Sequence, residues 1–223
     1  RTLEISRTFN ALITHINKTE FSFGRSLNLG CEFSKGEYLV FVSGHCVPVD
    51  NKWLVSLVEP LVSNECQYTY GRQVGRDTTK FSECQIFEKY FPEKSRVPQE
   101  GFFCNNANAA ITRQVWDFYR FDEDLTGCED MELAKRLIND GGKLAYVSDA
   151  AVFHIHDESW QGVKRRYERE SIALQKIMPQ LHLSFTDAVN FFLQGVIKDC
   201  RAALVRKVFF KDVFKIILIW YVH

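Results

Sequence analysis

The order of apolar and polar positions predicts a chain in which helices alternate with strands. Residues 38–42 form a continuous apolar run, as expected for a central strand that is buried on both faces. The patterns before and after it predict strands at 11–17, 67–73, 143–147 and 150–155, and helices at 2–9, 26–33, 53–62, 82–91, 160–178 and from 129 to the Gly141–Gly142 pair. Pro60 is expected to bend or end its helix. Helices that alternate with buried strands indicate an α/β fold, with a mostly parallel, Rossmann-like sheet flanked by helices.

One of these helices begins with two adjacent carboxylates, Glu129 and Asp130. The helix dipole stabilises negative charge in this first turn, while the apolar residues that follow share one buried face. A carboxylate held on a rigid helix at the edge of a pocket is well placed to accept a proton. The alternative is that both residues are ordinary acids of a helix N-terminus.

Two loops contain further candidate chemistry. Ser43, Gly44 and His45 directly follow the buried strand at 38–42, and binding sites in α/β sheets lie beyond the carboxyl ends of strands. Asparagines 105, 106 and 108 supply amide donors and acceptors that suit ligands rich in hydroxyl groups, although asparagines also gather in turns.

Composition indicates a globular protein, since 46% of residues are hydrophobic and 25% are charged. Basic and acidic residues balance at 28 each, so the charge gives no reason to expect a nucleic-acid partner. Seven cysteines without a C-x-x-C pair argue against a disulfide framework or structural zinc and favour a cytoplasmic location. The chain has no initiating methionine and opens inside an apparent helix, so we expect it to be N-terminally incomplete.

Five segments in their order along the chain resemble the family-2 glycosyltransferases of the GT-A fold, particularly bacterial rhamnosyltransferase-like enzymes. They are GRSLNLG to GEYLVFV at 24–42, YGRQ at 70–73, GFFCNNANAAITR at 101–113, FDEDLTGCEDMELAKR at 121–136 and AAVFHIH at 150–156. The resemblance covers roughly residues 2–174. It implies inverting transfer of a sugar from a nucleotide-sugar donor to a saccharide or lipid-linked acceptor, in the synthesis of cell-surface polysaccharide. The missing first strand, helix and second strand would hold the nucleotide base.

The resemblance also implies roles for individual residues. One acid of the Glu-Asp pair is the base that deprotonates the acceptor hydroxyl, with Asp130 the first choice and Glu129 the second. A single base suffices for inversion, unlike the paired carboxylates of glycoside hydrolysis. The expected donor-binding residues are Arg25, Asn28, Ser43, Gly44 and His45. The expected acceptor-lining residues are Arg72, Gln73, Asn105, Asn106 and Asn108.

The chain departs from the family pattern at the metal site. The Asp-x-Asp motif that holds a divalent cation, Mn²⁺ or Mg²⁺, is replaced by Ser43-Gly44-His45, which puts the use of a metal in doubt. Histidine can still bind a borderline metal such as Mn²⁺. Relatives with an Asp-x-His version pair that histidine with a later one, and His154 stands at the corresponding place with His156 two residues on. The alternatives are hydrogen-bonded structural histidines and catalysis without metal.

Residues 179–223 form a predicted helical extension to the catalytic domain of residues 1–178. Between 198 and 215 six basic residues stand against two acidic ones, interleaved with large apolar residues. This composition suits attachment to an anionic membrane surface, which would place the protein at the inner face of the cell membrane. Packing on the catalytic domain or on a second subunit is the alternative.

Two further functions remain open from the sequence. One is a catalytically degenerate carbohydrate-binding or scaffold protein of the same fold. The other is a hydrolase with zinc bound by His45, His154 and His156. Trp160 and the Arg165–Arg166 pair could flank an acceptor groove, although a helix surface is the simpler interpretation of the two arginines.

Overall fold

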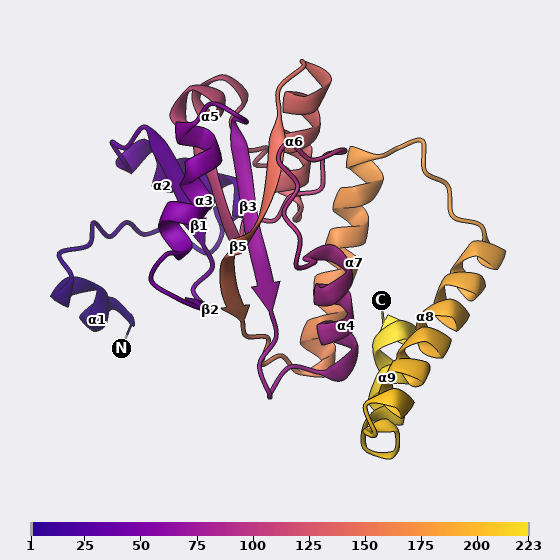
Figure 1. Cartoon of the computed structure of the whole chain (residues 1–223). Helices are drawn as coiled ribbons and strands as arrows, with labels where there is room; N and C mark the ends of the chain where they lie inside the picture. The colour runs from indigo at the N-terminus through magenta and orange to yellow at the C-terminus, as the bar shows by residue number, and fades with distance from the viewer. Residues whose placement is uncertain (1, 223) are drawn as a thin grey trace.

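The computed structural model describes residues 2–222 and shows an α/β fold, in which helices cover both faces of a mixed sheet (Figure 1). The strands are β1 (Tyr38–Val42), β2 (Cys46–Pro48), β3 (Tyr68–Val74), β4 (Asn108–Thr112) and β5 (Leu144–His154). The helices are α1 (Thr2–Thr8), α2 (Phe23–Phe33), α3 (Trp53–Val62), α4 (Phe81–Tyr90), α5 (Arg113–Tyr119), α6 (Glu129–Asn139), α7 (Trp160–Ile177), α8 (Phe185–Val205) and α9 (Phe209–Val222).

The predicted α/β fold with a sheet flanked by helices is confirmed, but the sheet is mixed where a mostly parallel one was expected. The strand order is β1-β4-β3-β5-β2; β1, β3 and β5 run in one direction and β4 and β2 in the other, so that β3 and β5 are the one parallel pair of neighbours in the described sheet. The cause is β4, which enters from the opposite direction and pairs antiparallel with both β1 and β3. Antiparallel partners need no crossover helix, so a short strand can fill this central position.

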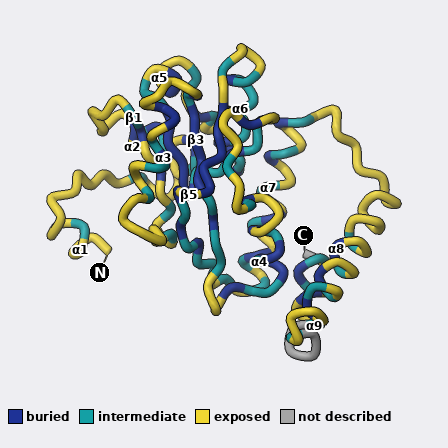
Figure 2. Tube along the Cα trace, viewed as in Figure 1, coloured by how far each residue is buried: buried dark blue, intermediate teal, exposed yellow. Residues whose placement is uncertain are grey.

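Side chains that alternate along the strands build two apolar layers, one on each face of the sheet. In β4, Ala109 and Ile111 join the larger layer, which also contains Trp116 of α5 and Leu133 of α6. The intervening Ala110 faces the smaller layer, which packs under α3. The middle of the sheet is buried between these two layers (Figure 2), and the candidate polar residues Gln73, Asn108 and His154 stand at or next to strand ends.

Several predicted boundaries hold and others do not. The strand at 38–42 is β1 as predicted, and α3 ends two residues after Pro60. Residues 11–17 form no strand, because they pair with no strand among the described residues and are largely exposed. The two strands predicted at 143–155 are one strand, β5, with an irregular register opposite Gly71 and Gln73. The Asn-rich loop continues into β4, which was not predicted.

The C-terminal segment is a pair of helices that packs beside α4 and α7 (Figure 1). Gly195 lies against the ring of Trp220, whose Nε1–H donates to Asp199 at 2.8 Å. Arg206 reaches α4 and donates to Glu88 at 2.9 Å. Among the described residues, no helix combines the length and the apolar character that a bilayer-crossing segment requires.

The side chain of Asn28 in α2 makes hydrogen bonds only within the protein. The structure therefore does not support the prediction that Asn28 binds the nucleotide-sugar donor. Its Nδ2 donates to Phe121 O and Glu123 Oε1, both at 2.9 Å, while its Oδ1 accepts from Trp116 Nε1 at 3.1 Å and Phe121 N at 3.0 Å. These four bonds use the full capacity of an asparagine side chain. Asn28 therefore fixes the start of the 121–128 segment that leads to α6.

We expect Asn28→Ala to lower the free energy of unfolding by about 1–3 kcal/mol, because it leaves buried N–H groups of Trp116 and Phe121 without acceptors. Urea unfolding followed by far-UV circular dichroism measures the change. Asn139→Ala is the matched control, since Asn139 is exposed at the end of α6. An equal effect of the two substitutions would contradict the cross-link.

Candidate active site

The candidate residues meet at one edge of the sheet. There β1 ends at Val42, opposite the first residue of β4, Asn108. The parallel strands β3 and β5 end at the same edge, and β5 finishes at His154. Because β4 is antiparallel to β1 and β3, it begins at the edge where those two strands end. The Asn-rich loop that precedes β4 therefore lies beside the Ser43–His45 turn.

Asp130 is held in a defined orientation at this edge. Its Oδ2 accepts the backbone N–H of Asn106 at 2.8 Å, and its Oδ1 accepts that of Met131 at 2.8 Å. Cys128 begins α6 from a left-handed conformation, with φ of 56°, which turns the chain sharply into the helix. The carboxylate is therefore fixed by backbone groups on both sides.

Glu129 and Asp130 are buried, and burial raises the pKa of both carboxyl groups above their ordinary range. The neighbouring negative charge of Asp130 raises the pKa of Glu129 further, while the two backbone N–H donors oppose the rise at Asp130. A carboxylate whose pKa is raised toward neutrality is a stronger base than an exposed one, which suits a group that must accept a proton.

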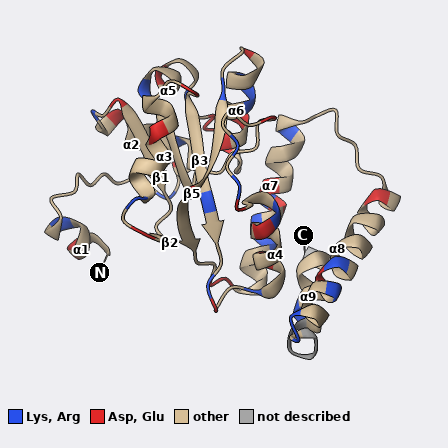
Figure 3. Ribbon diagram, in the orientation of Figure 1, with Lys and Arg blue, Asp and Glu red and all other residues tan. Residues whose placement is uncertain are grey.

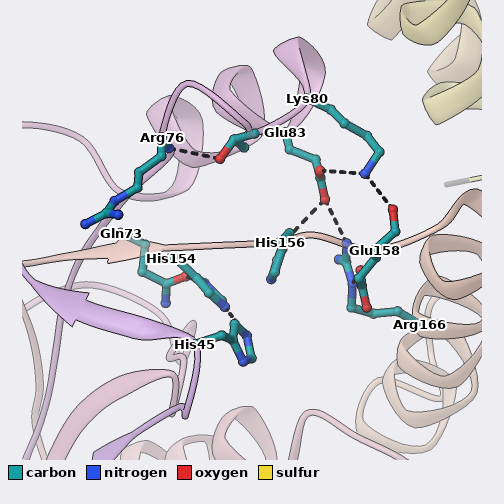
Figure 4. Close-up of polar contacts among 10 residues, drawn as sticks. His45, Gln73, Arg76, Lys80, Glu83, His154, His156, Glu158 and Arg166 are labelled. Atoms are coloured by element: carbon teal, nitrogen blue, oxygen red, sulfur yellow. Dashed lines mark hydrogen bonds and ion pairs between the residues drawn. The ribbon is translucent and has the colours of Figure 1, made fainter.

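Three histidines converge nearby (Figure 4). His45 lies in the turn between β1 and β2, and its carbonyl accepts the N–H of Ile155 at 3.1 Å, which ties this turn to the end of β5. The Nε2 atoms of His45 and His154 are 2.8 Å apart. The ring centroids of His154 and His156 are 4.2 Å apart, so all three rings share one cluster.

The cluster fits a divalent cation. One possible ligand atom from each histidine can be chosen so that all three lie within 4.8 Å of one another. Two nitrogen ligands at adjacent positions on one metal ion stand about 3 Å apart, close to the observed separation of the His45 and His154 nitrogens. Burial lowers the pKa of His154, and so does the proximity of His156, so His154 is neutral as a ligand must be. An all-imidazole set disfavours Mg²⁺, which prefers oxygen ligands.

A buried ionic group supports the cluster from the α4 side, and sequence reasoning did not predict it. Glu83 accepts from Arg166 at 2.8 Å, and its Oε1 lies 3.3 Å from His156 Nδ1 (Figure 4). Although burial opposes it, these neighbours lower the pKa of Glu83. Arg166 also donates to Glu158 at 2.9 Å. In the sequence Glu83 is only one more acid in the first turn of a helix, so no motif distinguishes it.

Side-chain amides connect the histidines to the Asp130 loop. The Nε2 of Gln73 donates to Asn105 Oδ1 at 2.8 Å, and its Oε1 lies 2.5 Å from His154 Nδ1. The residue after Asn105 supplies the backbone N–H that binds Asp130. The candidate base and the candidate cation site therefore belong to one hydrogen-bonded unit.

The other predicted residues divide between this site and the surrounding packing. Ser43 donates its backbone N–H to Ala107 at 3.1 Å, and Gly44 is exposed in the same turn. Asn106 accepts from the hydroxyl of Tyr68 at 2.5 Å. The remaining residues contact protein partners away from the histidines: Arg25 pairs with Glu20, Arg72 pairs with Glu93, and Asn108 is buried among Trp53, Arg72 O and Ala150 O.

Comparison with known proteins adds family relationships to this geometry. The model of the family described as glycosyl transferase family 2 matches residues 1–118. The chain is 25% identical over 173 residues to the O-antigen chain rhamnosyltransferase RfbN of Salmonella typhimurium, a match that covers 71% of this chain and 54% of RfbN. The chain therefore spans about half the length of this curated relative.

Solved structures share the fold. A mannosyltransferase from Pyrobaculum calidifontis, in complex with GDP-Man and Mn²⁺, matches with a TM-score of 0.58 and 14% identity, over 80% of this chain and 49% of its own. GalNAc-T7 with UDP, GalNAc and Mn²⁺ matches with a TM-score of 0.50 and 19% identity, over 70% of this chain and 34% of its own.

We expect His154→Ala to weaken Mn²⁺ binding at least about tenfold, because the substitution removes a preoriented nitrogen from the cluster. Titration of Mn²⁺ followed by electron paramagnetic resonance of the free ion measures the dissociation constant. His182→Ala is the matched control, since His182 is exposed before α8. Equal Mn²⁺ binding by the two variants would show that the histidine cluster does not bind the cation. Tight stoichiometric zinc in the purified protein would favour a hydrolase.

Proposed function

Because the chain belongs to glycosyl transferase family 2, we propose that it transfers a sugar from a nucleotide-sugar donor to a saccharide or lipid-linked acceptor. The likeness to an O-antigen chain rhamnosyltransferase supports rhamnose as the sugar and cell-surface polysaccharide as the product. The observation that carries the proposal is the hydrogen-bonded unit that connects Asp130, through the loop at 105–107, to the three histidines.

Asp130 acts as the base in this proposal. The acceptor hydroxyl gives its proton to the Asp130 carboxylate as its oxygen bonds to the anomeric carbon, and the bond from that carbon to the diphosphate breaks. The nucleoside diphosphate leaves with the electron pair, and the configuration at the anomeric carbon is inverted. One base is sufficient, because attack and departure occur on opposite faces of the sugar in a single displacement.

His45, His154 and His156 would hold a divalent cation, which supplies positive charge to stabilise the leaving diphosphate. Imidazoles bind a metal ion in their neutral form, so these ligands would leave the cation its full charge for the phosphates. Glu83 and Arg166 keep His156 in position from the opposite side.

We expect Asp130→Asn to reduce kcat about 10²–10⁴-fold, because an amide cannot accept the proton. Donor affinity, measured by calorimetry with the nucleotide diphosphate, should stay within about threefold, since in this proposal Asp130 acts on the acceptor. Asp117→Asn is the matched control, because Asp117 is exposed on α5.

The same experiment distinguishes an enzyme from a carbohydrate-binding scaffold of the same fold. A scaffold shows sugar or nucleotide binding without turnover in the unsubstituted chain. Full turnover by the Asp130→Asn variant would overturn the assignment of the base. Retained anomeric configuration in the product, read by NMR, would overturn the single displacement.

A further inference from the structure

Gln73, near the end of β3, lies beside His154 (Figure 4) and also contacts Asn105 in the loop before β4. Its side chain is only 2% exposed, so both ends of its amide must be satisfied by protein atoms. One end meets Asn105 Oδ1 at 2.8 Å, and the other meets His154 Nδ1 at 2.5 Å. The orientation of this amide decides which ring nitrogen of His154 carries hydrogen.

A backbone group fixes that orientation. The N–H of Ala107 contacts the Asn105 side chain at 3.0 Å. A backbone N–H only donates, so the atom that faces it is the Asn105 oxygen. Gln73 must then present its NH₂ group to this oxygen and its carbonyl to His154. The carbonyl only accepts, so His154 carries its hydrogen on Nδ1.

The other ring nitrogen of His154, Nε2, therefore carries a free lone pair. A neutral imidazole has one N–H, and in His154 the Nε2 atom that faces His45 at 2.8 Å is unprotonated. A carboxylate oxygen of Glu83 lies 3.3 Å from Nδ1 of His156 and accepts its hydrogen. Both histidines thus direct Nε2 away from their supporting partners.

We propose that Gln73, oriented by Asn105, is a positioning residue that locks His154 in the Nδ1–H tautomer and keeps its Nε2 ready to bind a divalent cation. This inference rests on the proposed function, because it assumes that the histidines hold the cation of a sugar transferase. We call the chain of hydrogen bonds from the N–H of Ala107 through Asn105 and Gln73 to His154 the amide relay. Because this relay begins at a backbone N–H, the backbone fold sets the tautomer of His154. Hydrogen-bond partners of this kind affect metal affinity about 10–100-fold.

Two substitutions test the proposal. Gln73→Met keeps the length of the side chain but removes both polar groups. Asn105→Asp keeps an oxygen acceptor for both Ala107 and Gln73. We expect Gln73→Met to weaken Mn²⁺ binding about 10–100-fold and Asn105→Asp to bind at least as tightly as the unsubstituted chain. Gln175→Met is the matched control, because Gln175 is an exposed residue of α7.

Long-range ¹H–¹⁵N correlation spectra of the metal-free protein, with ¹⁵N-labelled histidine, report the tautomer directly. His154 should show hydrogen on Nδ1 in the unsubstituted chain and a mixture of tautomers in Gln73→Met. Hydrogen on Nε2 of His154 in the unsubstituted chain overturns the proposal, and so does unchanged Mn²⁺ affinity in Gln73→Met.

This measurement also stands apart from the proposed activity. The spectra and the Mn²⁺ titration need no sugar nucleotide. A chain with the expected tautomer but without sugar transfer would contradict the proposed function alone, whereas active sugar transfer with the opposite tautomer would contradict the relay alone. The spectrum of the unsubstituted chain decides the question even where Gln73→Met does not fold.

A second observation, independent of the first, concerns the outer face of α8. Phe185, Val189, Leu193 and Ile197 recur every four residues and are 84%, 39%, 47% and 49% exposed. This spacing places them on one side of the helix. Much of α8 is exposed (Figure 2), while Gly195 and Asp199 contact Trp220 of α9.

Basic residues border this stripe. Lys198 and Arg201 of α8 are both exposed, and Figure 3 shows Lys and Arg positions on α8. We infer that this face, the α8 stripe, docks on an anionic phospholipid surface. Large apolar side chains would enter the boundary between headgroups and acyl chains, and the bordering cations would meet lipid phosphates.

We expect the chain to float with vesicles that contain phosphatidylglycerol and to bind purely zwitterionic vesicles at least about tenfold more weakly. Ile197→Glu should weaken binding to the anionic vesicles about tenfold or more, since it removes an apolar anchor and adds a repelled charge. Ile172→Glu is the matched control, because Ile172 is 50% exposed on α7, away from the stripe.

Equal binding by Ile197→Glu and Ile172→Glu overturns the assignment of the stripe. Analytical ultracentrifugation supplies the competing outcome, in which the unsubstituted chain is a dimer and Ile197→Glu is a monomer. That result would assign the stripe to a second copy instead of a membrane.

Discussion

The loop formed by Asn105, Asn106 and Ala107 is the constraint on which the whole site depends. Its backbone N–H groups serve two separate partners, Asp130 on one side and the side chain of Asn105 on the other. Its last carbonyl accepts the N–H of Ser43, which anchors the turn that carries a histidine. Three consecutive residues therefore position the candidate base, the amide relay and the cation turn. Backbone groups do this without side-chain freedom, so the geometry is rigid before any ligand binds.

The direction of β4 explains why that loop lies where it does. Because β4 runs antiparallel between β1 and β3, its first residue pairs with the last residue of β1. The segment before β4 is thus delivered to the edge at which β3 and β5 end. In a sheet of parallel strands alone, the segment before a central strand would lie at the opposite edge. The mixed topology is therefore a requirement of this site and not a variation on a parallel fold.

The sequence predicted the parts of this arrangement that depend on local pattern. The apolar run of β1 and the amphipathic face of α6 were evident, and so was the position of Asp130 at the start of that helix. It did not predict β4, because the two alanines of that strand have little strand preference, although Ala110 packs against α3 in the smaller layer. The sequence also did not predict the contact of Glu83 with His156 or the internal role of Asn28. Hydrogen bonds between distant segments produce no regular residue pattern in a sequence.

The environments of the two acids support Asp130 over Glu129 as the proposed base. Asp130 is ionised more readily, because two backbone N–H groups stabilise its charged form. Glu129 has its pKa raised both by burial and by the charge of Asp130, so it retains its proton more readily. Neighbouring carboxyl groups whose environments separate their pKa values in this way take different roles. The group that is ionised first is free to accept the proton of an incoming hydroxyl. Glu129, while it keeps its proton, adds no second negative charge beside Asp130 and leaves the assignment of the base to Asp130.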